Sequence, residues 1–278
     1  MTDFAVDTTL EGANGRFGGA LSRDWEVWGP FGGYVAALAL RAIGNSTELR
    51  RPASIAVHFL SPASFDQEIE IAVSTLRQGK RSAALQAQMT QGDQRILQAT
   101  AWVISDGMSG LEHDHAAMPR VPGFAELSSF SELASNFDEW YPLWHGSIEG
   151  RPVLWSSDPQ PAPPIWHTWM RLTRGMAADD PFLAAARSLL WLDLMMWNAT
   201  VPPHMPWPVS HLAPSLDLTA IFHDAAPDEE WLLCDAEAPI GKDNLVGGVG
   251  RVWTASGRLI ATGTSTLFCR PNPLAAGG

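Results

Sequence analysis

The pattern of apolar positions predicts a short buried helix near the start of the chain. Residues 35–43 are rich in Ala and Leu, which favour helix, and Arg41 is their only charge. Gly44 follows where a helix would end. The run is preceded by Trp28-Gly29-Pro30-Phe31-Gly32-Gly33-Tyr34. A helix that is apolar nearly all round must be covered on most sides, so we expect a sheet wrapped around it.

The segments after this helix alternate between apolar and polar residues with a period of two, which is typical of strands. Turn residues separate them at Gly79-Lys80 and Gly92-Asp93. The pattern therefore predicts an antiparallel meander with strands at 53–60, 68–73, 82–90 and 96–104.

The second half of the chain repeats this order. A strand at 166–172 is followed by a helix at 182–198, which Asp179-Asp180-Pro181 starts and Pro202-Pro203 ends. Strands are then expected at 215–223, 230–238, 246–254 and 259–269. The repeat predicts an α+β fold with two tandem units, each a central helix wrapped by an antiparallel sheet. We place the units at 1–105 and 151–278, with a surface linker at 106–150 that contains a short helix at 124–137.

Composition narrows the classes of partner. The formal net charge of −12 argues against nucleic acid and anionic membranes, and no stretch has the ~18–20 apolar residues of a membrane span. The acidic first residues lack the basic region of a secretory signal, and the two cysteines, Cys234 and Cys269, lie in apolar strands. We therefore expect a cytoplasmic protein with reduced thiols and no metal site. Thirteen tryptophans either fill the core or line an apolar ligand channel.

Short motifs follow one another in a fixed order along both halves of the chain. They are Phe31-Gly32-Gly33, Phe59-Leu60-Ser61-Pro62, Thr75-Leu76-Arg77-Gln78-Gly79-Lys80, Trp169-Met170-Arg171, Leu192-Asp193-Leu194, Leu216-Asp217, Glu230-Trp231-Leu232-Leu233 and Phe268-Cys269-Arg270. In this order and spacing the sequence resembles the double hotdog acyl-CoA thioesterases, the bacterial thioesterase II family. The resemblance implies a double hotdog fold and hydrolysis of an acyl-CoA thioester, with coenzyme A as part of the substrate and no other cofactor or metal.

In that family a strand Asp, a hydroxyl residue and a Gln hold the hydrolytic water. The resemblance places the Asp at Asp217, and aligning the two repeats puts this carboxylate at the position of Ile55. Ser265 stands at the Gln position, and the stretch Ala238-Pro239-Ile240 at the hydroxyl position has no hydroxyl. Thr219, two residues after Asp217, and Asn244 are the possible replacements. Asp193, on the second helix, resembles a family position with a mainly structural role.

Substrate contacts are expected at the start of the first helix. Backbone N–H groups at Gly32, Gly33 and Tyr34 could hold the thioester oxygen, although glycines there could equally serve close packing of helix on sheet. Arg81, with Arg50, Arg51 and Lys80, supplies the cations nearest to the expected site for the CoA phosphates. His58 carries no local Asp–His motif of a hydratase, so we interpret it as a structural histidine.

The sequence thus predicts a cytoplasmic acyl-CoA thioesterase of fatty acid metabolism that forms a homodimer. In this interpretation Asp217 orients or deprotonates the water and Ser265 or Thr219 assists. Because the set of catalytic side chains is incomplete, two other functions stay open. One is a non-catalytic protein that binds acyl groups or CoA, and the other is a hydratase or dehydratase on the same scaffold.

Overall fold

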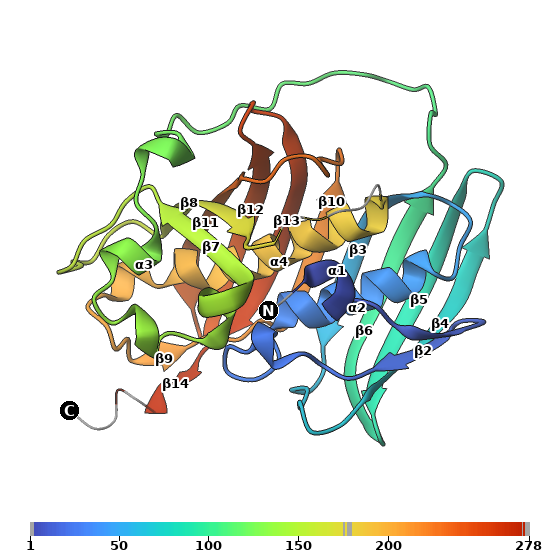
Figure 1. Cartoon of the computed structure of the whole chain (residues 1–278), viewed down its shortest axis with the longest axis horizontal. Helices are drawn as coiled ribbons and strands as arrows, with labels where there is room; N and C mark the ends of the chain where they lie inside the picture. The colour runs from blue at the N-terminus through green and yellow to red at the C-terminus, as the bar shows by residue number, and fades with distance from the viewer. Residues whose placement is uncertain (1–2, 175, 177–179, 274, 276–278) are drawn as a thin grey trace.

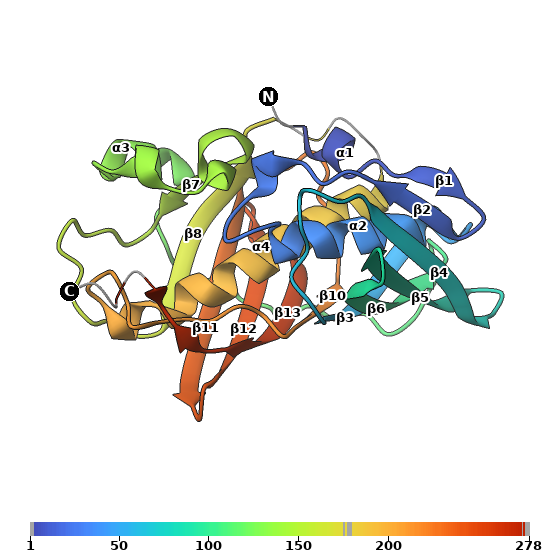
Figure 2. The ribbon, with the colours of Figure 1, turned by 90° about the horizontal axis from the view of Figure 1, so that it is seen from below.

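In the computed structural model, residues 3–174, 176, 180–273 and 275 are described. Most of their strands form one antiparallel sheet in the order β1-β2-β4-β5-β6-β3-β10-β13-β12-β11-β8-β7, and the short strands β9 and β14 pair separately. The sheet curves around two helices, α2 (Gly32–Gly44) and α4 (Pro181–Thr200), which lie side by side on its inner face (Figures 1 and 2). The α+β class and the tandem arrangement predicted from the sequence are confirmed.

The first repeat contains α2 and the six strands on one side of the sheet. The bounds of its four predicted strands follow the predicted alternation closely, because one face of each of these strands packs on α2. The elements before the linker are α1 (Phe4–Asp7), β1 (Glu11–Ala13), β2 (Arg16–Gly19), η1 (Arg23–Trp25), β3 (Arg51–Phe59), β4 (Ile69–Gln78), β5 (Ser82–Gln91) and β6 (Gln94–Ile104).

The second repeat is built in the same way around α4. Asp180 caps this helix by accepting from the N–H groups of Phe182 and Leu183, and Pro181 occupies its first turn, as the sequence indicated. Asp179 lies outside the described residues. Its elements are β7 (Ile148–Pro152), β8 (Ile165–Leu172), η5 (Pro202–His204), β9 (His211–Leu212), β10 (Asp217–Phe222), β11 (Leu232–Lys242), β12 (Leu245–Thr254), β13 (Leu259–Phe268) and β14 (Arg270–Pro271).

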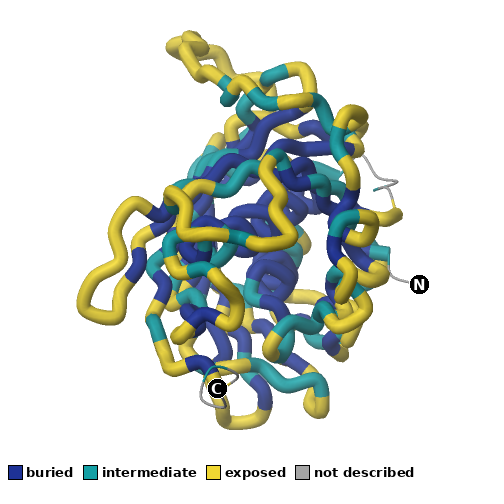
Figure 3. Tube along the Cα trace, turned by 90° about the vertical axis from the view of Figure 1, so that its left-hand side faces the viewer, coloured by how far each residue is buried: buried dark blue, intermediate teal, exposed yellow. Residues whose placement is uncertain are grey.

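The two repeats join along one seam. Strands β3 and β10 pair antiparallel from Asp217↔His58 to Ile221↔Ser54, so the sheet continues from one repeat into the other. Behind the seam, the helices run antiparallel in direct contact. A methyl group on Gly33 would lie 2.9 Å from the Cα atom of Leu190, and one on Gly44 would lie 2.7 Å from the ring of Phe182. Buried residues gather along these helices and the inner strand faces, and exposed ones in the loops (Figure 3).

The linker differs from its prediction in one respect. Instead of one helix at 124–137, it contains η2 (Phe124–Glu126), α3 (Phe130–Leu133), η3 (Phe137–Glu139) and η4 (Leu143–Ser147). Tertiary contacts break the helix: the Phe124 ring stacks on Trp231 at 5.2 Å and lies edge-on to Trp169 at 5.7 Å. The linker thereby covers the outer face of the sheet in the second repeat. The proposed unit boundaries at 1–105, 106–150 and 151–278 stay a prediction.

Candidate active site

A β-bulge lies at the start of β10, beside the seam. Ser215 bridges to Leu267, and Thr219 pairs with Thr264. Three residues of one strand (216–218) therefore oppose two of the other (265–266). Such an extra residue interrupts the regular ladder and re-aims side chains, and bulges are frequent next to active sites. Asp217 is the middle residue of this bulge.

Side chains complete the hydrogen bonds that the bulge interrupts. One carboxylate oxygen of Asp217, Oδ1, accepts from the backbone N–H of Thr266 at 2.8 Å. The hydroxyl of Ser265 donates to the backbone carbonyl of Asp217 at 2.6 Å. Asp217 is half-buried, whereas Ser265 is buried. The carboxylate is thus held at one oxygen, and among the described residues no hydrogen bond to the other oxygen, Oδ2, is found.

Thr219 lies one pair further along β10. Its hydroxyl is 2.7 Å from the hydroxyl of Thr264 on β13. All three residues thus lie at the bulge, but Ser265 is buried on the helix side of the sheet, whereas Thr219 lies on the other face; their action as a catalytic set stays a prediction. Asn244 lies in the turn between β11 and β12 with a φ of 65°, and its carbonyl accepts from the N–H of Cys269.

A second carboxylate lies on the inner side of the seam. Asp193, in the middle of α4, accepts from the backbone N–H of Gly33 through Oδ2 at 2.7 Å and from the hydroxyl of Ser215 through Oδ1 at 2.9 Å. It is buried, and this burial raises its pKa to about 6, although both hydrogen bonds act in the opposite direction.

The glycines at the start of α2 allow this contact. A Cβ atom on Gly32 would lie 2.8 Å from the Asp193 carboxylate, and one on Gly33 would meet the backbone at Leu190. Close packing is therefore one role of the Gly-Gly pair, and the N–H of Gly33 donates to Asp193. Tyr34 is fully buried: its hydroxyl donates to the carbonyl of Asp7 and accepts from the N–H of Ser22.

The cations predicted to bind CoA phosphates lie far from Asp217 along the sheet. Arg81 is exposed in the turn between β4 and β5, where its carbonyl accepts from the N–H of Ser105. That turn lies beside the Arg51 end of β3, because Arg51 and Ser82 both pair with Ile104. Asp217 pairs with His58 near the other end of β3. The structure therefore does not bring Arg81 close to the bulge.

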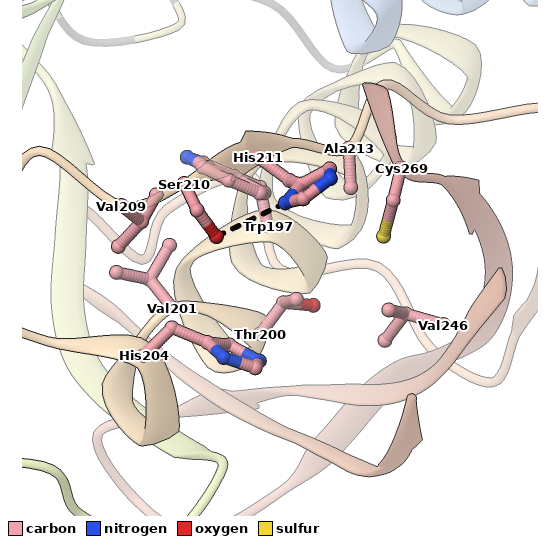
Figure 4. A pocket seen from close by; sticks show the side chains of 10 residues that line it. All are labelled: Trp197, Thr200, Val201, His204, Val209, Ser210, His211, Ala213, Val246 and Cys269. Carbon is pink, nitrogen blue, oxygen red and sulfur yellow. Dashed lines mark hydrogen bonds between the residues drawn. The ribbon is translucent and has the colours of Figure 1, made fainter. Parts of the chain in front are cut away.

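A small cavity lies beside the C-terminal turns of α4 (Figure 4). Its volume is about 40 Å³, which by this measure is room for about three water molecules. Its walls are mostly apolar. The residues that line it include Trp197, Thr200, Ala213, Val246 and Cys269. Trp197 is one helical turn beyond Asp193, and Ala213 is two residues before Ser215.

Two family models cover most of the chain. The acyl-CoA thioesterase N-terminal domain matches residues 21–104, and the acyl-CoA thioesterase C-terminal domain matches residues 112–268. The chain belongs to the acyl-CoA thioesterase family. Its reaction is hydrolysis of an acyl-CoA thioester without a metal ion, so the family supports the thioesterase prediction over the two alternatives.

Solved structures of similar fold agree with this assignment. The chain is similar to the tesB protein of Mycobacterium avium subspecies paratuberculosis, with 21% identity, 96% of this chain and 98% of that chain covered, and a TM-score of 0.78. It is also similar to acyl-CoA thioesterase II TesB2 of Mycobacterium marinum, with 21% identity, coverage of 98% and 99%, and a TM-score of 0.79. A hot dog fold protein of Alicyclobacillus acidocaldarius shows 22% identity, coverage of 98% and 100%, and a TM-score of 0.79. At these identities the likeness concerns the fold.

Sequence reasoning missed two parts of the candidate site. The bulge itself was not predicted, because it depends on the pairing of residues 215–219 with 264–267. The contact of Asp193 with Gly33 and Ser215 was also missed, since these residues come from three segments. A signal for the second feature was present: Asp193 is a lone carboxylate in a helix that is otherwise apolar almost all round, and a carboxylate in such a place needs hydrogen-bond donors.

Within the described ranges, no helix is long and apolar enough to cross a membrane. Both cysteines are free, Cys234 buried and Cys269 partly buried.

Proposed function

We propose that the thioester is hydrolysed at the β10 bulge and that Asp217 orients and deprotonates the attacking water. The observation that supports this most is a half-buried carboxylate with one oxygen fixed by the Thr266 N–H and the other without a partner among the described residues. A carboxylate held in this way is a suitable general base once a water lies within hydrogen-bond reach.

The proposed reaction conserves protons and charge. Water attacks the thioester carbonyl carbon as Asp217 accepts one of its protons. The tetrahedral intermediate then collapses, the carbon–sulfur bond breaks, and the CoA thiolate receives the proton from Asp217. The products are a free carboxylic acid and CoA. Such proton transfer typically contributes about 10²–10⁴-fold to a rate.

Two neighbouring hydroxyl residues are proposed to assist. Ser265 fixes the backbone of Asp217 through its bond to the carbonyl, and this bond holds the bulge in one conformation. Thr219 lies two residues after Asp217 in β10. Its hydroxyl pairs with that of Thr264 and can also accept a hydrogen bond from a water.

The start of α2 is proposed to hold the thioester oxygen. The N-terminus of a 13-residue helix carries unpaired N–H groups and a partial positive charge, which favour a developing oxyanion. Gly32, Gly33 and Tyr34 supply these N–H groups, of which that of Gly33 is shared with Asp193. Arg81 is assigned only to the phosphorylated end of CoA, the part of the substrate farthest from the thioester.

We further propose that the acyl group enters the cavity beside α4. Its apolar lining suits a hydrocarbon chain, and its volume of about 40 Å³ accommodates a short one. Trp197 forms part of the wall and packs edge-on against Trp28 at 5.5 Å.

The experiment that tests this function measures thiol release from a series of acyl-CoAs, from acetyl-CoA to palmitoyl-CoA, with the wild type, Asp217→Asn and Ala213→Leu. We expect kcat/KM to be highest for a short chain and to fall at least 100-fold in Asp217→Asn for every substrate. Ala213→Leu narrows the cavity, so it should shift the preference toward shorter chains.

The control variant is Asp243→Asn. Asp243 is an exposed turn residue with a φ of 53°, a conformation that Asn adopts readily. The kcat/KM values and the chain-length preference of Asp243→Asn should equal those of the wild type. Unchanged turnover in folded Asp217→Asn would reject the assigned base, and an unchanged chain-length profile in Ala213→Leu would reject the acyl pocket.

The cellular location and the assembly also belong to the proposal. We infer a cytoplasmic homodimer active in fatty acid metabolism, because acyl-CoA is its substrate class and its two cysteines are free thiols. Light scattering of the purified protein checks the mass of the assembly, for which twice 30.2 kDa is expected.

A further inference from the structure

Asp193 connects three segments that come together only in the folded chain. Its carboxylate projects from the middle of α4, accepts from the first turn of α2 at Gly33, and accepts from Ser215 just before β10. The start of α2 belongs to the first repeat, whereas α4 and the segment at Ser215 belong to the second. No other described residue bonds to both the start of α2 and the segment that leads into the bulge.

Ser215 is an anchor for the bulge. It bridges to Leu267 on β13, and the next residue, Leu216, donates its N–H to the carbonyl of Thr266 and accepts from the N–H of Phe59. Asp217 follows directly. The position of the Asp217 carboxylate therefore depends on where Ser215 is held, and the only hydrogen bond found for the Ser215 hydroxyl in the described part of the chain is to Asp193.

We propose that Asp193 is a positioning residue for hydrolysis: through Ser215 and Gly33 it fixes the bulge that carries Asp217 relative to the start of α2. This inference rests on the proposed role of Asp217. A carboxylate suits the task because it accepts from two donors at once, and hydrogen bonds to an ionised acceptor are about twice as strong as those to a neutral one.

The protonation of Asp193 is governed by burial, and not by a nearby charge. The basic groups on its own helix and on α2 are engaged elsewhere: Arg187 donates to the carbonyls of Ala226 and Glu229, and Arg41 pairs with Asp180 at the other end of α2. The remaining titratable or charged residues on the elements packed around α4 are Tyr34 on α2, Arg51 and His58 on β3, His167 and Arg171 on β8, His204 on η5, Asp217 on β10, Cys234, Asp235, Glu237 and Lys242 on β11, and Arg251 on β12.

Protonation would remove one of the two acceptor sites. A protonated carboxyl keeps one good acceptor oxygen and turns the other into a donor, so either Ser215 or Gly33 loses its acceptor, and the remaining bond is no longer to a charged group. The positioning role therefore predicts that turnover declines as the pH falls through about 6, the pKa of Asp193.

The test uses the full chain and a double-mutant cycle with Ser215→Ala and Asp217→Asn. Ser215→Ala removes one hydroxyl and leaves both carboxylates in place. It should lower kcat about tenfold with KM unchanged, and the unfolding midpoint in urea should move little. In the Asp217→Asn background the same substitution should lower the residual kcat by less than twofold, because the group being positioned is already gone.

The control is Ser188→Ala, which removes another buried serine hydroxyl of the same region, one that bonds only weakly, at 3.5 Å, to the carbonyl of Ala184. It should leave kcat unchanged. Asp193→Asn adds an independent readout: the decline of kcat near pH 6 seen in the wild type should disappear, while the far-UV circular dichroism is retained.

Each outcome decides a different statement. If Ser215→Ala keeps the wild-type kcat, or loses the same factor with and without Asp217, the positioning role is wrong. Identical pH profiles of the wild type and Asp193→Asn would also overturn it. If Asp217→Asn alone is fully active, the proposed base fails first, and that single variant identifies this failure without reference to Asp193.

Discussion

At the scale of residues, two carboxylates of the second repeat differ in what surrounds them. Asp217 sits half-buried in a strand bulge and holds a backbone N–H, whereas Asp193 is buried in the core and bonds to donors from two other segments. A protein keeps a buried charge at an energetic penalty, since desolvation favours the neutral form. Such a charge is a candidate for a role in function.

Asp193→Asn should therefore stabilise the protein at neutral pH. The folded-state pKa of about 6 lies above the ordinary value of 3.8, so the folded state binds the proton more tightly than the unfolded state. In the wild type this group adds stability that is complete below pH 3.8 and is lost as the pH rises through 6. A difference of about two pH units corresponds to roughly 3 kcal/mol. Urea unfolding at pH 4.5 and pH 7.5 should give the variant a larger free energy of unfolding, relative to the wild type, at pH 7.5 than at pH 4.5. The same difference at both pH values would contradict the raised pKa of Asp193.

At the scale of elements, the contact between α2 and α4 sets the distance across the seam. The helices approach so closely at Gly33 that a methyl group there would lie 2.9 Å from the Cα atom of Leu190. Backbone atoms cannot move aside as a flexible side chain can. The contact therefore fixes the start of α2, where the thioester oxygen is proposed to bind.

Gly33→Ala should consequently destabilise the chain by about 1–3 kcal/mol, the usual range for overpacking a core. The matched control is Gly247→Ala on β12, where an added methyl group meets nothing within 4 Å. Thermal unfolding of both variants compares the two sites. A Gly33→Ala protein as stable as Gly247→Ala would show that the helices are not held at this distance.

The elements themselves were predictable from the sequence, and their relations were not. Both central helices and the strands of both meanders lie within a few residues of the predicted ranges, because amphipathic period is a local property. The prediction of one helix at 124–137 was wrong because these residues pack on other elements: Phe124 contacts Trp231, and Phe130 contacts Trp144. Asp217 was singled out because it aligns with Ile55 of the first repeat, but its setting in a bulge could not be predicted, because the bulge depends on pairing with a strand some 48 residues away.

At the scale of the whole molecule, the repeats share one sheet and one core. Pairing of β3 with β10 makes the sheet continuous, and buried residues of both repeats belong to a single hydrophobic cluster around α2 and α4. A smaller cluster of Trp169, Trp231, Leu233 and Trp253 lies on the outer face under the linker. The active site is proposed at the seam, so neither repeat contains it alone.

The chain should therefore unfold as one cooperative unit. Its tryptophans allow a direct check, because only Trp25, Trp28 and Trp102 precede the linker, and fluorescence reports mainly on the second repeat. Circular dichroism reports on both. We expect the two signals to give the same urea midpoint, as a two-state transition requires. Separate midpoints would indicate repeats that fold independently and a seam of little stability.

The central claim is that the Asp217 carboxylate activates the water that cleaves the thioester. Single-turnover hydrolysis with enzyme in excess over a short acyl-CoA tests it most directly, because this regime separates binding from chemistry. The account predicts that Asp217→Asn reaches saturation at the same enzyme concentration as the wild type but cleaves the bound thioester at least 100-fold more slowly. Cleavage at the wild-type rate by folded Asp217→Asn would contradict it.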